Sequence, residues 1–185
     1  MLRSVQDDAP RLASRTVGVI GSGSAAHPEL AEPLGRLLAH LGVNLLTGGG
    51  RGVMEAVARA FVTAAPHCGI SIGVLPCDES DATRLPEGYP NDYVQFAVVT
   101  HLPDRGRRGH LPSSRNHVIV LSSDVIVALP GSHGTESELR LALDYHKPTV
   151  AYCSSLSSVG HFPAGITRVT SVADVESFLR SALKF

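Results

Sequence analysis

Three glycine-rich stretches follow predicted strands, and their residue types suit the binding of a phosphate group. They are GSGSAA at residues 21–26, GGGRGVM at residues 48–54 and PGSHGTESE at residues 130–138. Glycine lets the backbone adopt positive φ angles and approach a ligand closely. A helix that follows such a turn offers free N–H groups and a partial positive charge. Each stretch is therefore a candidate anion site, and the alternative is a tight turn without a ligand.

The residues that would form these turns are the candidate ligand-binding residues. They are Gly21, Ser22, Gly23, Gly48, Gly49, Gly50, Gly52, Met54, Pro130, Gly131, Ser132, His133, Gly134 and Thr135. GSGSAA fits the dinucleotide pattern G-x-G-x-x-G/A, which also requires an acidic residue near the end of the second strand. Residues 44–50, NLLTGGG, contain no acid, and the chain has no G-x-x-x-x-G-K-[ST] motif. The sequence therefore disfavours a classical NAD or FAD site and a P-loop ATPase.

Arg115 and Asn116 stand at the start of a predicted helix, before the strand that leads into the third turn. An arginine can hold a phosphate group through two hydrogen bonds. Arg115 follows a basic loop, residues 100–114, whose own arginines we expect to be solvated. The alternative is a surface arginine paired with a nearby acid. We predict that Arg115 is catalytic and that Asn116 contributes to binding.

Glu138 closes the third stretch and has two open interpretations. With Thr135 it has the S/T-x-x-E spacing of a capping box, in which the two side chains satisfy amides at the start of the helix. Alternatively, Glu138 contacts a ligand or takes part in catalysis. The helix dipole stabilises a carboxylate in the first turn by roughly 0.3–1 kcal/mol. We therefore expect Glu138 to be ionised, which suits a base or an acceptor for ribose hydroxyls better than a general acid.

Other chemistries have little support in the residue spacing. Ser132 and His133 are adjacent, which rarely forms a nucleophile–base pair, and G-x-S-x-G is absent. The nine histidines show no metal-ligand spacing, so we predict no metal site. Cys68, Cys77 and Cys153 are an odd number without C-x-x-C spacing, which fits neither a disulfide framework nor a zinc site. A reducing cytoplasm is the expected compartment.

The composition is that of an ordinary globular protein, with 43% hydrophobic residues, 18% charged residues and a net charge of −1. A net charge near zero argues against a general nucleic-acid binder. No apolar run is long enough for a membrane span, so neither nucleic acid nor a membrane is an expected partner. We expect a flexible arm without a signal peptide at residues 1–15 and a single domain at residues 16–185.

Short segments rich in β-branched residues alternate with segments of helical periodicity. The predicted strands are residues 16–20, 43–46, 70–75, 93–99, 124–129 and 149–153. The predicted helices are residues 27–42, 51–65, 135–146 and 171–185. Strands that are apolar on both faces are typical of a parallel sheet covered by helices. We therefore predict an α/β fold, a Rossmann-like doubly wound parallel sheet with helices on both faces, which brings the turns to one sheet edge.

Two of these stretches also resemble a known family. GGGRGVMEA at residues 48–56 and, after Arg115, PGSHGTESE at residues 130–138 are similar to motifs of the LONELY GUY-like group, formerly called lysine decarboxylase-like. That group carries a GGG-x-x-G-x-M turn and a PGG-x-GT-x-x-E signature. The resemblance covers roughly residues 16–152 and implies a Rossmann-like fold, usually dimeric. It also implies hydrolysis of nucleoside 5′-monophosphates to free base and ribose 5-phosphate, without a required cofactor.

The resemblance implies a role for each matching residue. Gly131, Gly134 and Thr135 would bind the phosphate group, and Glu138 would be the catalytic acid or an orienting carboxylate. Arg115 would correspond to the second arginine of the family's M-R-x-R-K segment. These roles place the catalytic pair, Arg115 and Glu138, beside the phosphate turn.

The sequence departs from this pattern at four positions. The methionine and first arginine of M-R-x-R-K are replaced by Pro112 and Ser113, the lysine by Asn116, and the second glycine of PGG by Ser132. The SRN version resembles a sister branch that includes molybdenum-cofactor carrier proteins. Molybdenum cofactor is a pterin with a terminal phosphate, so the same turns could hold it as cargo without catalysis.

Three hypotheses follow. The protein is a phosphoribohydrolase that uses Glu138 and Arg115; or it is a non-catalytic carrier or sensor of molybdenum cofactor or a nucleotide; or it is an interaction protein with vestigial turns. The first two share a phosphorylated small molecule as the partner, and the third predicts no small ligand. A homodimer is expected from the resemblance.

Overall fold

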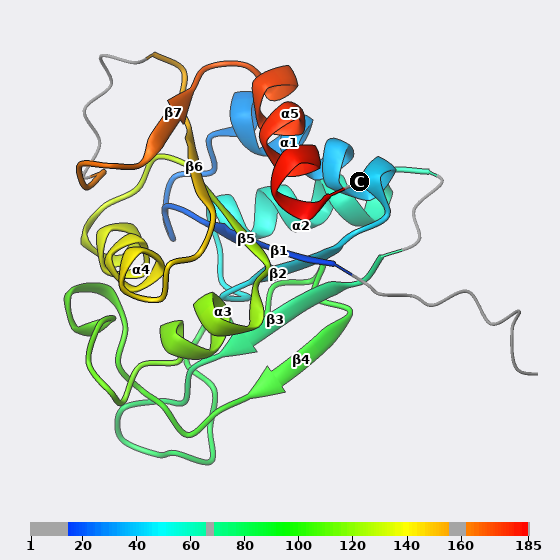
Figure 1. The fold of residues 1–185 in the computed structure, drawn as a ribbon. Coiled ribbons are helices and arrows are strands. Elements are labelled where there is room, and N and C mark those ends of the chain that lie inside the picture. The colour runs from blue at the N-terminus through cyan, green and yellow to red at the C-terminus, as the bar shows by residue number, and fades with distance from the viewer. Residues whose placement is uncertain (1–14, 66–68, 156–161, 185) are drawn as a thin grey trace, which may run out of the picture.

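A seven-stranded parallel sheet forms the centre of the protein (Figure 1). The structure, a computed structural model, describes residues 15–65, 69–155 and 162–184. The expected N-terminal arm, apart from Arg15, lies outside the described residues, as does Cys68. The strand order is β4-β3-β2-β1-β5-β6-β7, and every pair is parallel. The strands are β1 (Thr16–Ile20), β2 (Asn44–Thr47), β3 (Ser71–Leu75), β4 (Phe96–Val99), β5 (Val125–Ala128), β6 (Thr149–Tyr152) and β7 (Thr167–Val169).

Helices cover both faces of this sheet, as predicted. The helices are α1 (Pro28–Leu41), α2 (Val53–Thr63), α3 (Asn116–Ser122), α4 (His133–Asp144) and α5 (Val172–Leu183), with a short 3-10 helix η1 (Gly106–Arg108). Figure 1 shows α1, α2 and α5 on one side and α3 and α4 on the other. The Rossmann-like α/β class is therefore confirmed. None of the described helices is both long enough and apolar enough to cross a membrane.

The alternation of strand side chains divides the core between the two faces. Val17 and Val127 pack with α1, α2 and α5, whereas Ile20 and Ile126 pack with α3 and α4. These side chains are almost completely buried, and each contributes about 1.5–3 kcal/mol by leaving water. The central strands β1 and β5 are thus fixed from both sides. Their carboxyl ends, where the glycine turns begin, are held rigidly.

Residue types that commonly begin or end helices lie at the ends of α1 and α5. Pro28 begins α1, and Gly42 ends it in the left-handed conformation, with its amide donating to Ala39 O at 3.1 Å. Ser171 caps α5 by accepting a hydrogen bond from the Asp174 amide at 3.1 Å.

The elements β4, β7 and α4 differ from the predictions. β4 begins at Phe96 rather than at residue 93, because the preceding residues form a turn in which the Val94 amide donates to Asn91 O. The edge strand β7 was not predicted, since three residues with one apolar side chain carry no periodic signal. The third difference, the start of α4 at His133, changes the interpretation of the third glycine turn.

Candidate functional site

The three glycine turns meet at the carboxyl edge of β1, β2 and β5, where they enclose a cavity of about 270 Å³. Most of the predicted turn residues, together with Arg115, Asn116 and Glu138, line this cavity. The lining consists of Val19, Ile20, Gly21, Ser22, Gly23, Gly48, Met54, Tyr89, Arg105, Gly106, Arg115, Asn116, Ser132, Gly134, Thr135 and Glu138. The fold therefore brings turns from distant parts of the chain together at one site.

Five further candidate residues do not line the cavity but shape its walls: Gly49, Gly50, Gly52, Pro130 and Gly131. Asn91 holds the second turn, because its amide donates to Gly49 O at 2.8 Å and its side-chain Nδ2 donates to Gly50 O at 2.7 Å. Gly52 has a φ of 67° and lies so close to Ser22 O that a β-carbon would overlap it. Glycine at this position is therefore needed for the second turn to pack against the first.

Ser22 connects all three turns. Its amide donates to Pro130 O at 3.1 Å, its carbonyl accepts from the Val53 amide at 2.9 Å, and its Oγ accepts from the Ala25 amide at 2.9 Å. The Val53 amide at the start of α2 is thereby used within the protein. The anion site expected at the second turn stays a prediction, and the Val53 amide is not available to it. The first turn of α4 is the helix start that opens into the cavity, through Gly134 and Thr135.

Of the two interpretations of Glu138, the capping box with Thr135 is wrong. The helix begins two residues earlier than predicted, with Ser132 at its N-cap and no side-chain hydrogen bond to the cap. Thr135 therefore lies inside the first turn, where it is 3% exposed, and its Oγ1 has no hydrogen-bond partner among the described residues. A β-carbon on Gly131 would overlap this Oγ1. The third turn thus folds around a buried hydroxyl group that forms no hydrogen bond with the residues that the structure describes.

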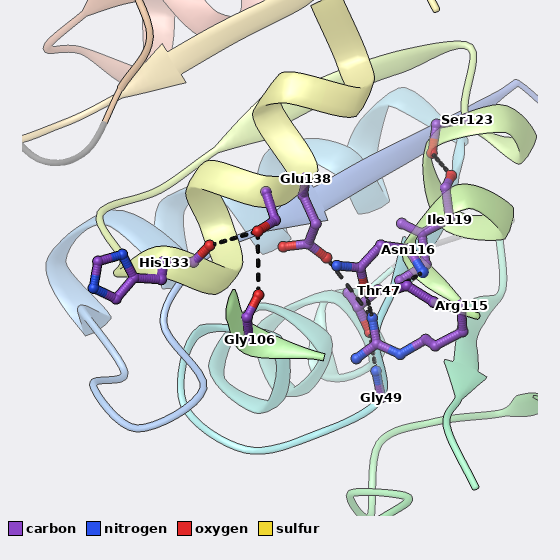
Figure 2. Close-up of polar contacts among 11 residues, drawn as sticks. Thr47, Gly49, Gly106, Arg115, Asn116, Ile119, Ser123, His133 and Glu138 are labelled. Carbon is purple, nitrogen blue, oxygen red and sulfur yellow. Dashed lines mark hydrogen bonds and ion pairs between the residues drawn. The ribbon is translucent and has the colours of Figure 1, made fainter. Parts of the chain in front are cut away.

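Arg115 and Glu138 lie side by side in the cavity (Figure 2). Arg115 Nη1 donates to Asn116 Oδ1 and lies 3.8 Å from Glu138 Oε1. Arg115 is 4% exposed and Glu138 is 8% exposed. Arg115 Nε is buried without a partner in the described part of the chain. A β-carbon on Gly48 would overlap Arg115 Nη2, so the second turn must have glycine there to admit the guanidinium group.

Glu138 is expected to be only partly ionised near neutral pH, rather than fully ionised as its position in the sequence indicated. Burial raises the pKa of Glu138 to about 7, and the neighbouring Arg115 guanidinium, which acts in the opposite direction, only partly offsets this. Because α4 begins earlier than predicted, Glu138 lies beyond the first three residues of the helix, where the dipole effect weakens. A carboxyl group with a pKa near neutrality can both donate and accept a proton at physiological pH.

Sequence reasoning missed two side chains of the site, Tyr89 and Arg105. Both come from the long loops at residues 76–92 and 100–114, whose unusual length was the one available signal. Arg105 was expected to be solvated, yet its guanidinium lies 5.8 Å from the centre of the Tyr89 ring. Gly106, the next residue, also lines the cavity.

Other candidates lie elsewhere. His133 points away from the Arg115–Glu138 pair (Figure 2), and its Nδ1 is 3.6 Å from Glu136 Oε2. It borders a separate surface hollow with Arg107. Within residues 15–65, 69–155 and 162–184, no group of three or more histidine, cysteine, aspartate or glutamate residues could hold a metal ion.

Comparisons with known proteins agree with this architecture. The molybdenum cofactor binding protein of the phototrophic bacterium Rippkaea orientalis is 29% identical, with a TM-score of 0.69 over 92% of this chain and 98% of its own. The molybdenum cofactor carrier protein of Chlamydomonas reinhardtii is 28% identical, with a TM-score of 0.68 over 93% of this chain and 99% of its own.

One relative found by sequence is named as an enzyme. The cytokinin riboside 5′-monophosphate phosphoribohydrolase of Rhodococcoides fascians is 25% identical over 187 aligned positions, which cover 90% of this chain and 86% of that protein. The similarity to these proteins therefore spans nearly the whole chain and includes the cavity. The sequence model of the SLOG cluster4 family matches residues 14–178, and the chain belongs to the SLOG cluster4 family.

Proposed function

We propose that the protein binds a phosphorylated heterocycle, either a nucleoside 5′-monophosphate or a pterin phosphate, in the cavity at the start of α4. The observation that carries the proposal is a pair of buried polar atoms, Thr135 Oγ1 and Arg115 Nε. Neither has a hydrogen-bond partner among the described residues, and both residues line the same cavity. Buried polar groups without partners are rare in native proteins and call for a specific explanation. An anionic ligand supplies one.

The phosphate group belongs at the first turn of α4. Backbone amides there have no acceptor within the helix, and Gly134 and Thr135 line the cavity at this point. Arg105 and Arg115 face the same space, with Glu138 as the acidic residue in the lining. Because Glu138 is only partly ionised near neutral pH, the cavity carries a positive charge that favours an anion.

The size of the cavity defines which part of the ligand it encloses. Its volume of about 270 Å³ lies below the roughly 300–1,000 Å³ of sites that enclose a drug-sized ligand. The cavity therefore suits the phosphate and the adjoining sugar or ring. The remainder of the heterocycle would extend toward Tyr89 at the side of the cavity.

Hydrolysis of a nucleoside 5′-monophosphate is the catalytic form of this proposal. Water would add to C1′ of the ribose, the electron pair of the C1′–N bond would pass to the base, and the base would gain a proton. Glu138 would exchange the proton, since its pKa of about 7 lies close to the working pH. Arg115 would bind the phosphate group, and its positive charge would stabilise the ionised form of Glu138. No metal or organic cofactor is needed for this reaction.

Carriage of a pterin phosphate such as molybdenum cofactor is the second candidate. Two observations favour it: the full-length similarity to a molybdenum cofactor binding protein and a carrier protein, and the proline and serine at positions 112 and 113. The same phosphate contacts would then retain the ligand unchanged.

We also propose that the protein is a homodimer. The edge strand β4 exposes two large apolar side chains, Phe96 at 57% and Val99 at 64%. Such exposure on an edge strand is unfavourable in an isolated chain. Sedimentation equilibrium at micromolar concentration should give twice the chain mass, and the mass of one chain would exclude the dimer.

Release of free base from adenosine 5′-monophosphate separates the two candidates. For a hydrolase, Glu138→Gln should reduce the rate by about 10²-fold or more, because the proton transfer is lost. Glu136→Gln on the same helix, outside the cavity lining, is the matched control and should keep the rate. If wild-type protein releases no base but binds a pterin phosphate and returns it unchanged, the carrier is correct. If it binds neither ligand, the proposed function is wrong.

A further inference from the structure

Arg105 presents a positive charge to the cavity, and the described part of the chain shows no ion pair within 4.0 Å for it, although its charge helps to lower the pKa of Asp78. It lines the cavity and is partly buried. Its guanidinium group lies over the Tyr89 ring, whose centre is 5.8 Å from Arg105 Cζ. An arginine over an aromatic face is held by a cation–π interaction, which leaves its N–H groups free to donate hydrogen bonds. Arg105 therefore differs from an arginine whose N–H groups are held by a carboxylate in a close ion pair.

The neighbouring arginines of the loop do not share this arrangement. Arg108 Nη2 lies 2.6 Å from Glu79 Oε1, and Arg108 Nε lies 3.1 Å from Asp104 Oδ1, so its charge is balanced by two carboxylates. Arg107 borders the separate surface hollow, with Glu136 and Arg140, rather than the cavity. Of the three arginines in this loop, Arg105 is the one that lines the cavity.

The loop that carries Arg105 is fixed to the first turn of α4. Ser137 Oγ donates to Gly106 O at 3.1 Å and to His133 O at 2.9 Å, so one hydroxyl joins the loop to the helix start (Figure 2). Gly134 is close enough that a β-carbon on it would lie 3.6 Å from Gly106 Cα. These contacts place Arg105 directly beside the helix turn that offers free amides.

Tyr89 is fixed from the opposite side. A β-carbon on Gly50 would come within 2.9 Å of Tyr89 Cζ, which shows that the ring rests on the second glycine turn. Met54 touches the same point, with Cε 3.0 Å from that β-carbon. The ring is thus a rigid support, and it holds the guanidinium group of Arg105 at the cavity.

We propose that Arg105 is a second phosphate-binding arginine, which donates to the ligand's phosphate group opposite Arg115 while Tyr89 positions its guanidinium. This inference rests on the proposed function, because it assigns a residue to the phosphate of the same ligand. Arg105 closes the phosphate site from the loop side, and Arg115 and the α4 amides close it from the sheet side. Tyr89 is a positioning residue that acts through Arg105.

Calorimetric titration with adenosine 5′-monophosphate and with inorganic phosphate tests this assignment. Arg105→Gln should weaken the binding of both probes by about tenfold or more, because a charge-assisted hydrogen bond is lost. It should also reduce the dependence of Kd on salt concentration. Arg107→Gln removes the same charge from the same loop and should change the Kd of each probe by less than about twofold.

Tyr89 provides an independent readout. Tyr89→Phe keeps the aromatic face and should bind phosphate like the wild-type protein, whereas Tyr89→Leu should weaken phosphate binding about two- to fivefold. Arg105→Gln and Tyr89→Leu combined should be no weaker than Arg105→Gln alone. If Arg105→Gln binds both probes within twofold of the wild type, the inference is wrong, although the proposed function stands. If wild-type protein binds neither probe, the inference is wrong; if it also fails to bind a pterin phosphate, the proposed function is wrong as well.

Discussion

Replacing Arg115 with methionine is expected to lower the free energy of unfolding at pH 8 by about 3–5 kcal/mol, the usual effect of removing one partner of a buried ion pair. Glu138 lies 3.8 Å from the lost guanidinium and is 8% exposed. Without Arg115, Glu138 must either stay ionised as an unpaired buried charge or take up a proton at pH 8, where the proton concentration is low. Methionine fills the space of the arginine side chain, so the loss of stability reflects the unpaired charge of Glu138 rather than a cavity.

The pH dependence identifies this cause. At pH 5 Glu138 is already protonated in the folded wild-type protein, because burial raises its pKa to about 7. The effect of Arg115→Met should therefore be smaller at pH 5 than at pH 8. Arg140→Met removes an exposed arginine that pairs with Glu136 at 2.6 Å and should change stability by less than about 1 kcal/mol. An equal loss for Arg115→Met at both pH values in urea unfolding would contradict the account.

Replacing Glu138 with glutamine is expected to remove a component of the pH dependence of stability. The pKa of Glu138 rises from 4.5 in the unfolded chain to about 7 in the folded protein. Between these values the folded protein binds more protons than the unfolded chain, so its stability decreases as pH rises. The contribution is complete below pH 4.5 and is lost by about pH 7, with an upper magnitude of about 3 kcal/mol.

Urea unfolding of wild-type protein and Glu138→Gln across pH 4.5 to 8 measures this component. The variant should become more stable relative to the wild type as pH rises, because glutamine cannot ionise. Glu136→Gln is the control on the same helix, and no such relative change is expected for it. Parallel curves for wild type and Glu138→Gln would show that Glu138 is not buried as described.

Much of the site was predictable because glycine spacing encodes backbone geometry. The three turns, the strand before each and the position of Arg115 all follow local rules, and the parallel sheet necessarily brings the carboxyl ends of its strands to one edge. Gly48 and Gly131 illustrate this point: each is glycine because a side chain, Arg115 in one case and Thr135 in the other, occupies the space of a β-carbon.

The missed features depend on tertiary contacts that no local pattern encodes. The Thr135–Glu138 spacing matches a capping box, yet α4 begins at His133. The pKa of Glu138 followed burial rather than its place in the sequence. Tyr89 and Arg105 reach the cavity because Gly50 and the first turn of α4 support their loops. Loop paths of this kind are set by packing against distant residues.

The most direct test of the central claim is a titration of wild-type protein and Thr135→Val with adenosine 5′-monophosphate and a pterin phosphate. Thr135 Oγ1 is buried and has no partner in the described residues, so its proposed role is to donate to the phosphate group. Valine keeps the shape and removes an unsatisfied hydroxyl, so the free protein should be as stable as the wild type or more stable.

The wild-type protein is expected to bind at least one of the two ligands, and Thr135→Val is expected to bind it about tenfold or more weakly, without loss of stability. Equal affinity of Thr135→Val and wild-type protein would contradict the placement of the phosphate group at the first turn of α4. Absence of binding by the wild-type protein would contradict the proposed function itself.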